Sequence, residues 1–249
     1  MLKVLGTGLR IAFLGDSFMR TNFHAFVDIA VNYTSPYPGI NHNWCGQNIT
    51  DMEIGGRAKL STFGEFDAKM GCWHGGANVT VRTDESDSIL TYYSLLHSGQ
   101  DEIDQIFPAK DHFDWIFLSY GLHDIGSFSV EDFTNKLKRR LIQFKKRTTI
   151  TGFPSRLVFM GLWAQYAARK PEKWQWAGSN IRTSKFITAV RQVTRELGVP
   201  FIDIFDLSLP MLDANIDGVH FNESIKRSIA MLIVKHLEVV NVGVLEASV

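Results

Sequence analysis

The feature that most constrains the fold is an alternation of short apolar segments ending at glycine with longer segments of helical periodicity. The first apolar segment, residues 10–14 (Arg-Ile-Ala-Phe-Leu), ends at Gly15. Helical spacing follows at once, at Phe23, Phe26 and Val27. A continuous apolar run of this length is typical of a strand that is buried on both faces. A strand followed directly by a helix predicts the start of a parallel sheet.

The second half of the chain repeats this pattern more regularly. The apolar segments predict strands at residues 115–120, 157–160 and 201–205. Helical periodicity predicts helices at residues 129–144, 179–197 and 223–239. The first of these helices opens with Ser129-Val-Glu-Asp132, which has the form of a capping box, and Gly198 stands where a helix commonly closes.

The first half is less regular after its opening strand and helix. Residues 31–76 are rich in Gly, Asn, Pro and Trp, which predicts a long irregular excursion. Residues 78–82 alternate in polarity as a strand does, and residues 88–106 are expected to form a helix with Leu90, Tyr93 and Leu96 on one face.

No internal repeat or low-complexity linker interrupts the sequence, so we expect a single domain over residues 1–249. Right-handed crossovers between parallel strands then predict a three-layer α/β/α sandwich around a central parallel sheet of about five strands, as in flavodoxin-like folds. Ligands of such sheets bind at the carboxyl ends of the strands. The residues just after each predicted strand are therefore the candidates for a functional site.

Two of these positions carry the residue types of nucleophilic catalysis. Ser17 follows the first strand in Gly15-Asp-Ser17, at a helix N-terminus whose amides favour developing negative charge. A serine hydroxyl needs an adjacent base, which is usually a histidine held in one tautomer by a carboxylate. Asp217-Gly-Val-His220, just before the last helix, supplies both groups from one short segment.

These two segments resemble the first and last blocks of the SGNH/GDSL hydrolases. The context Ile-Ala-Phe-Leu-Gly-Asp-Ser-Phe-Met-Arg around Ser17 is closest to the PC-esterase and trichome-birefringence-like branch, whose members act on O-acetyl groups of glycans. The resemblance implies that Ser17 is the nucleophile, His220 the base and Asp217 its orienting carboxylate. It also implies an oxyanion hole formed by backbone amides of Ser17 and a second-block glycine, for which Gly56 has the better context and Gly75-Gly76 is the rival.

The third block departs from that family, which commonly has Gly-x-Asn-Asp. Here the chain has Gly121-Leu-His123-Asp124, so His123 stands where the family has its oxyanion-binding Asn. An imidazole N–H can donate the same hydrogen bond. A histidine that packs beneath the site is an equal alternative, and Asp124 is expected to be a structural hydrogen-bond acceptor.

Structural interpretations of the other site residues also stay open at this stage. Ser17 can serve as a helix cap, and Asp217-Gly218 can form a simple turn. Candidate substrate-binding residues outside the three blocks are aromatic or cationic side chains, namely Arg20, Trp163, Tyr166 and Trp174. The alternatives for them are a lid packed by its own aromatic side chains and, for Arg20, a salt bridge.

Composition excludes several classes of partner. The formal net charge is zero, which argues against nucleic acid, and no stretch reaches the roughly 20 apolar residues of a membrane helix. Motifs typical of metal sites and of dinucleotide or phosphate binding are missing, so we expect no metal and no cofactor.

Cys45, Cys72 and sequons at Asn32, Asn48, Asn78 and Asn222 favour a secretory lumen. From the residues that precede the first strand we expect no signal peptide, which keeps a cytoplasmic location open.

The sequence therefore predicts a serine esterase acting on small-molecule or glycan esters, most plausibly acetyl groups on carbohydrate. The same triad would serve an O-acetyltransferase that moves acetyl groups onto glycan hydroxyls. Two further alternatives are a catalytically inactive glycan-binding domain of the same fold and a flavodoxin-like protein that binds a phosphorylated ligand. The poor phosphate cradle after the first strand weakens the last of these.

Overall fold

The computed structural model describes residues 8–30, 52–54, 58–67, 72–81, 87–94, 112–150 and 156–246. By their internal contacts the residues separate into two compact units. The Ser17 unit comprises Ile11–Arg20 and Tyr93–Asn222, and the α9 unit comprises Met1–Arg10, Thr21–Tyr92 and Glu223–Val249. The expectation of a single domain stays a prediction.

Parallel strands form the centre of the Ser17 unit. In spatial order they are β1 (Arg10–Gly15), β6 (Trp115–Ser119), β7 (Arg156–Met160) and β8 (Phe201–Ile202). All three neighbouring pairs are parallel, and the register places Gly15 beside Ser119. The carboxyl ends of β1 and β6 therefore lie level with each other. This register brings the segment after Gly15 and the segment after Ser119 to the same edge of the sheet.

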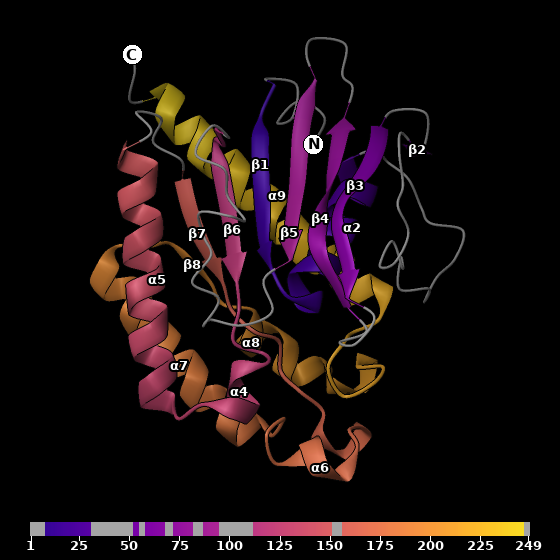
Figure 1. Ribbon diagram of the computed structural model, residues 1–249, viewed down its shortest axis with the longest axis vertical. Coiled ribbons are helices and arrows are strands. Elements are labelled where there is room, and N and C mark those ends of the chain that lie inside the picture. Colours follow the sequence, from indigo (N-terminus) through magenta and orange to yellow (C-terminus); the bar gives the residue numbers. More distant parts are fainter. Residues whose placement is uncertain are drawn as a thin grey trace. The chain divides into compact units, whose positions relative to one another are not determined.

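The longer helices of this unit begin and end at residues that cap them. Helix α5 (Val130–Ile150) follows Ser129, whose Oγ accepts a hydrogen bond from the Asp132 N–H at 3.0 Å. Helix α7 (Asn180–Leu197) ends at Gly198, which has the left-handed φ of 61°. The two helices pack together through Phe133 and Phe186, whose ring centroids are 4.9 Å apart. Helix α5 runs beside strand β7, and α7 lies next to the lower half of α5 (Figure 1).

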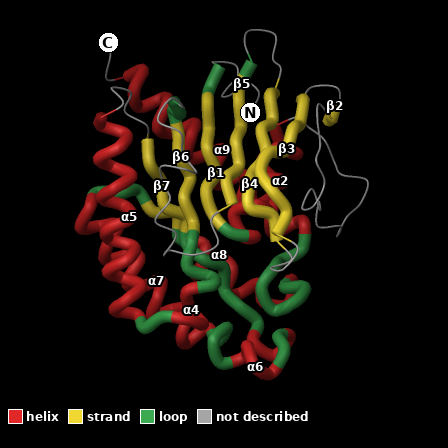
Figure 2. The backbone as a smooth tube through the Cα atoms, viewed as in Figure 1, coloured by secondary structure: helices red, strands yellow, loops and turns green. Residues whose placement is uncertain are grey.

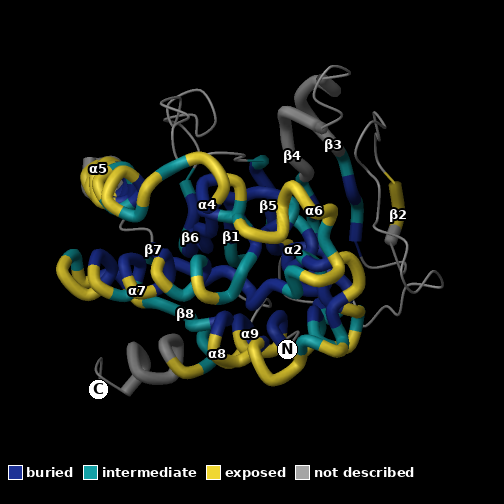
Figure 3. The backbone as a smooth tube through the Cα atoms, turned by 90° about the horizontal axis from the view of Figure 1, so that it is seen from below, coloured by how far each residue is buried: buried dark blue, intermediate teal, exposed yellow. Residues whose placement is uncertain are grey.

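Short elements complete the unit at the carboxyl edge of its strands (Figure 2). They are α4 (Asp124–Ser127), the 3₁₀ turn η1 (Ala167–Arg169), α6 (Glu172–Gln175), α8 (Ile204–Ser208) and the 3₁₀ turn η2 (Leu209–Ala214). Strands β1, β6 and β7 are almost entirely buried, whereas β8 is half-buried and the outer turns of α5 and α7 are exposed (Figure 3). Phe13 and Phe117 stack at 5.4 Å in the core, where the side chains of β1 and β6 meet.

The α9 unit contains an antiparallel arrangement. Its strands β2 (Met52–Ile54), β3 (Ala58–Asp67) and β4 (Cys72–Val81) pair antiparallel in that order, with β5 (Ser88–Ser94) next to β4. The Thr91 hydroxyl donates a 2.8 Å hydrogen bond to Asn78 Oδ1. The unit also holds most of α2 (Ser17–Ala30) and the helix α9 (Glu223–Glu246). Within the described residues, no helix combines the length and apolar character that crossing a membrane requires.

Three sequence-based expectations about secondary structure are wrong. The described residues hold eight strands rather than about five, because β2, β3 and β4 occupy part of the segment expected to be irregular. Residues 88–94 form a strand, not a helix; their β-branched and aromatic side chains suit a pleated surface. The strand at residues 201–205 ends after Ile202, because Asp203 caps α8 by accepting from the Asp206 N–H. The α/β class itself, with helices flanking a sheet, is confirmed.

Candidate active site

Ser17 is placed by a tight strand-to-helix turn. Strand β1 ends at Gly15, where any Cβ would collide with the Ser119 carbonyl oxygen and the Met19 side chain. Asp16 is fully buried, and its Oδ1 accepts a 2.9 Å hydrogen bond from the Phe18 N–H in the first turn of α2. This bond satisfies one of the free amides of the helix N-terminus. Ser17 is thereby held as the first residue of α2, with its hydroxyl at the end of the strand.

Asp217 and His220 lie in a short loop before α9 and contact each other directly. The Asp217 Oδ2 is 2.8 Å from His220 Nδ1, while Oδ1 accepts hydrogen bonds from the backbone N–H groups of Val219 at 2.9 Å and His220 at 2.7 Å. Partial burial opposes ionisation of Asp217, but the hydrogen bonds from His220 and Val219 and the charge of His220 lower its pKa well below the ordinary value. Asp217 is therefore an ionised acceptor at neutral pH.

The loop that carries this pair is closed on itself. Asn215 and Phe221 form an isolated antiparallel bridge, and the Gly218 N–H donates to Asn215 Oδ1 at 2.6 Å. Gly218 has a φ of 91°, which strongly favours glycine, and a Cβ there would also lie 3.0 Å from the Tyr166 carbonyl oxygen. Its own carbonyl accepts the Tyr166 N–H at 3.0 Å. These bonds fix the orientation of the Asp217 and His220 side chains.

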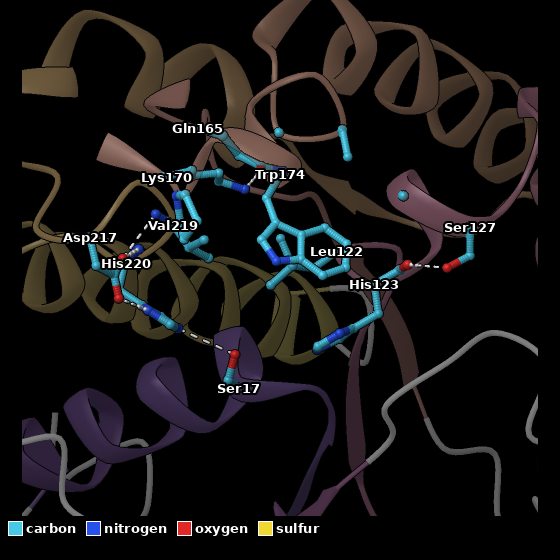
Figure 4. Close-up of a pocket in the computed structure, with 14 residues that line it drawn as sticks. Ser17, Leu122, His123, Ser127, Gln165, Lys170, Trp174, Asp217, Val219 and His220 are labelled. Carbon is cyan, nitrogen blue, oxygen red and sulfur yellow. Dashed lines mark hydrogen bonds and ion pairs between the residues drawn. The ribbon is translucent and has the colours of Figure 1, made fainter. Parts of the chain in front are cut away.

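His220 also reaches the serine from which it is separated by 203 residues. Its Nε2 is 3.2 Å from Ser17 Oγ, and its side chain is 21% exposed (Figure 4). Because Nδ1 faces an ionised carboxylate, the ring proton belongs on Nδ1 and the Nε2 lone pair faces the hydroxyl. This arrangement can remove the serine proton and activate the oxygen as a nucleophile.

Asp16 combines deep burial with an unusual ionisation. Burial raises its pKa to about 7; the charge of Asp124 adds to the rise, whereas the Phe18 N–H and Arg20 oppose it. The folded protein therefore holds this proton up to about pH 7, whereas the unfolded chain releases it near the ordinary value of 3.8. The contribution of Asp16 to the free energy of unfolding is therefore largest below that lower value and falls as the pH rises through this window.

We expect Asp16→Asn to flatten this pH dependence, because asparagine keeps the acceptor for the Phe18 N–H and cannot ionise. We compare the free energy of unfolding of the variant with that of wild type at each pH. Between pH 4 and pH 8 this difference should shift in favour of the variant by up to about 4 kcal/mol. Urea unfolding across this range measures the effect, with the exposed Asp213→Asn as control. Asp28, whose pKa burial also raises to about 7, keeps part of the slope. An unchanged slope in Asp16→Asn would contradict the assignment.

A pocket of about 420 Å³ opens beside Ser17 (Figure 4). The pocket is lined by Ser17 and by residues from three segments, 122–127, 165–178 and 217–220. His220 and His123 lie on opposite sides of Ser17, and the Trp174 indole extends over the space between them (Figure 4). Among the described residues, no group of three or more His, Cys, Asp or Glu side chains could hold a metal ion.

The candidate residues fall into three groups in the structure. Ser17, His123, Trp174, Asp217 and His220 all line the pocket, and Trp174 is 51% exposed. His123 also accepts a 3.2 Å hydrogen bond from the Ser127 hydroxyl through its carbonyl oxygen, at the start of α4. Gly56 and Cys45 lie outside the described residues. The second oxyanion amide therefore stays a prediction.

The remaining candidates are not among the residues that line the pocket. Trp163 is 3% exposed and packs between Phe18, at 5.0 Å edge to face, and Phe221, at 4.8 Å stacked. The Tyr166 ring is covered by the Arg169 guanidinium at 5.0 Å. The charge of Arg20 lowers the pKa of Asp16. The structure therefore gives these three side chains packing or electrostatic contacts outside the pocket.

Sequence reasoning missed the polar residues of the pocket wall opposite Ser17. Lys170 and Gln165 both line the pocket, and the Lys170 ammonium donates a hydrogen bond to Gln165 Oε1. Neither residue belongs to one of the three recognised blocks. The only sequence signal was their position in the aromatic segment that follows the strand at residues 157–160.

No protein-family model and no curated protein sequence matches this chain. Solved structures do match it over nearly its whole length. A lipase/acylhydrolase from Enterococcus faecalis matches with a TM-score of 0.54 at 14% identity, covering 92% of this chain and 95% of that one. A peptidoglycan O-acetylesterase matches with 0.56 at 13% identity, covering 96% and 94%. An acetyl xylan esterase matches with 0.52 at 10% identity, covering 92% and 99%.

The chain therefore has the fold of the SGNH/GDSL hydrolases, as the Gly-Asp-Ser and Asp-x-x-His segments predict. At 10–16% identity this likeness establishes the fold. The PC-esterase branch stays a prediction.

Proposed function

We propose that this protein is a serine esterase in which Ser17, His220 and Asp217 form the catalytic triad. The observation that carries the proposal is the continuous chain of contacts from Ser17 Oγ to Nε2 and from Nδ1 to the Asp217 carboxylate, at 3.2 and 2.8 Å. An inactive binding domain of this fold would have no need to keep these two distances. The adjoining pocket gives an ester room beside the nucleophile.

The reaction that we propose proceeds through an acyl-enzyme. His220 Nε2 takes the proton of Ser17 as Oγ attacks the ester carbonyl carbon, and Asp217 stabilises the imidazolium that forms. The carbonyl oxygen becomes an oxyanion near the Ser17 N–H at the start of α2 and the His123 ring. The imidazolium then protonates the departing alcohol. Water, deprotonated by the same nitrogen, releases the acid and restores Ser17.

We further propose that the ester is an acetyl group on a carbohydrate. The half-exposed Trp174 ring over the pocket offers a face on which a sugar ring can stack. Two of the structural neighbours are a peptidoglycan O-acetylesterase and an acetyl xylan esterase, which supports the same substrate class.

Acetate release together with active-site labelling tests the proposal. The purified chain is incubated with p-nitrophenyl acetate and with acetylated xylan, and in parallel with a fluorophosphonate probe whose adduct is located by mass spectrometry. We expect acetate from both esters and one adduct, on Ser17. A Ser17 adduct with acetyl transfer to added sugar, in place of acetate release, would assign the transferase instead. Absence of both adduct and turnover would reject the triad.

A further inference from the structure

The pocket wall opposite Ser17 carries a positive charge whose hydrogen-bonding capacity is largely unused. Lys170 follows η1, and its half-buried ammonium donates one hydrogen bond, to the neutral Gln165 Oε1. No carboxylate among the described residues forms an ion pair with it. An ammonium carries three donor protons, so the bond to Gln165 leaves two of them available.

Gln165 adds a second unused donor at the same place. This side chain is only 2% exposed, lines the pocket, and its Nε2 has no hydrogen-bond acceptor in the part of the chain that the structure describes. Its backbone N–H donates to Asn180 Oδ1 at 2.7 Å, which holds the residue in place. Buried polar groups without a partner are rare in folded proteins, because each costs the desolvation of that group. A donor of this kind in a pocket wall indicates a missing acceptor.

Lys170 is also held rigidly. Its aliphatic chain lies between Gly178 and Gly218, and a Cβ on either glycine would collide with it. Gly218 belongs to the loop that carries Asp217 and His220, and its carbonyl accepts the Tyr166 N–H at 3.0 Å. The ammonium is thus positioned by the same loop that positions the catalytic base. A charge fixed in this way is preorganised, so a ligand does not have to order it.

The unused donors of Lys170 and Gln165 indicate the chemistry of the ligand group that would bind them. A cation beside an amide N–H₂ matches a carboxylate, whose two oxygens accept both. Burial lowers the pKa of Lys170 and the charge of Asp217 opposes this, so a bound anion would further stabilise the ammonium. Asp217 is not that anion, because its carboxylate pairs with His220 at 2.8 Å and, among the described residues, forms no ion pair with Lys170.

We propose that Lys170 and Gln165 bind a carboxylate of the substrate, so that the preferred ester is one of an acidic sugar. The inference rests on the proposed esterase function and names its substrate class. In Figure 4, Lys170 and Gln165 lie across the pocket from Ser17, with the Trp174 ring between. A sugar ring against Trp174 would then present its ester to Ser17 and its carboxylate to Lys170.

A pair of substrates that differ only in charge tests this. O-acetylated methyl glucuronide is compared with O-acetylated methyl glucoside for wild type, Lys170→Met, Gln165→Glu and the control Lys185→Met, in which the lost charge is exposed on α7. We expect wild type to prefer the acidic ester by about tenfold to a hundredfold in kcat/KM, mainly through KM. Lys170→Met should bring the ratio near one, and Gln165→Glu should do the same by placing its own carboxylate beside Lys170. Lys185→Met should keep the wild-type ratio.

Two results would overturn the inference while leaving the esterase proposal intact. One is equal use of both esters by wild type. The other is an equal loss on both esters in Lys170→Met, which would mean that Lys170 acts only through the Asp217 loop. Calorimetric titration of Ser17→Ala with methyl glucuronide and methyl glucoside is independent of turnover. If no ester is hydrolysed but the glucuronide still binds more tightly and loses that advantage in Lys170→Met, the subsite stands and the esterase proposal fails.

Discussion

Ser17→Ala is expected to lower kcat/KM for ester hydrolysis by about 10⁴- to 10⁶-fold, and His220→Ala by a similar factor. The first variant removes the oxygen that forms the acyl-enzyme, and the second removes the nitrogen 3.2 Å away that accepts its proton. Because the two side chains act as one unit, the double variant should be hardly less active than either single variant. Initial rates with p-nitrophenyl acetate and an acetylated glycan measure this.

Matched controls separate chemistry from folding in that experiment. Ser184→Ala removes a hydroxyl from helix α7, where it donates to the Ile181 carbonyl oxygen of the same helix, and should retain wild-type rates. Circular dichroism and thermal unfolding of each variant check that the fold is kept. Activity in Ser17→Ala within tenfold of wild type would mean that another residue is the nucleophile. Additive losses in the double variant would mean that Ser17 and His220 do not act together.

Asp217→Asn is expected to lower kcat by about 10⁴-fold while leaving the fold intact. Asp217 Oδ1 accepts the N–H groups of Val219 and His220, so the single oxygen of asparagine should stay with these two donors. Its amide N–H₂ would then face Nδ1, which must become an acceptor. The ring proton would move to Nε2 and point at Ser17 Oγ, so the ring could no longer accept the serine proton.

Nitrogen-15 NMR of labelled histidine tests this tautomer change independently of turnover. In wild type at a pH where the ring is neutral we expect the proton on Nδ1, and in Asp217→Asn on Nε2. Asp213→Asn, an exposed position four residues earlier, is the control and should change neither the tautomer nor kcat. An unchanged tautomer combined with a less than tenfold loss of kcat would contradict the role of Asp217.

The parts of the fold that sequence predicted well depend on local interactions. Ser129 caps α5 by accepting the Asp132 N–H three residues later, and Gly198 ends α7 with the positive φ that glycine tolerates. The strands at β1, β6 and β7 are short, apolar and bounded by polar or glycine residues. The helix ends depend on groups that are close in sequence, and the strands are marked by their own apolar composition, although β1 pairs with β6 from a distant part of the chain.

Sequence prediction failed where the partner of a segment lies elsewhere in the chain. The spacing of Leu90 and Tyr93 fits one face of a helix, yet residues 88–94 form a strand paired with β4, where Thr91 bonds to Asn78. Trp163 was expected at the substrate, but Phe18 and Phe221 enclose it. Neither outcome can be derived from periodicity, because packing against distant residues overrides local preference.

The residue types of the site and much of its local geometry are encoded in short stretches of the amino-acid sequence. Asp217, Val219 and His220 form their hydrogen bonds within three residues, so this loop is largely encoded where it stands. Long-range packing is what brings His220 to Ser17 across 203 residues and places Lys170 and Gln165 in the wall of the same pocket. The physical reason is the parallel sheet, which gathers the ends of strands that are distant in sequence at a single edge.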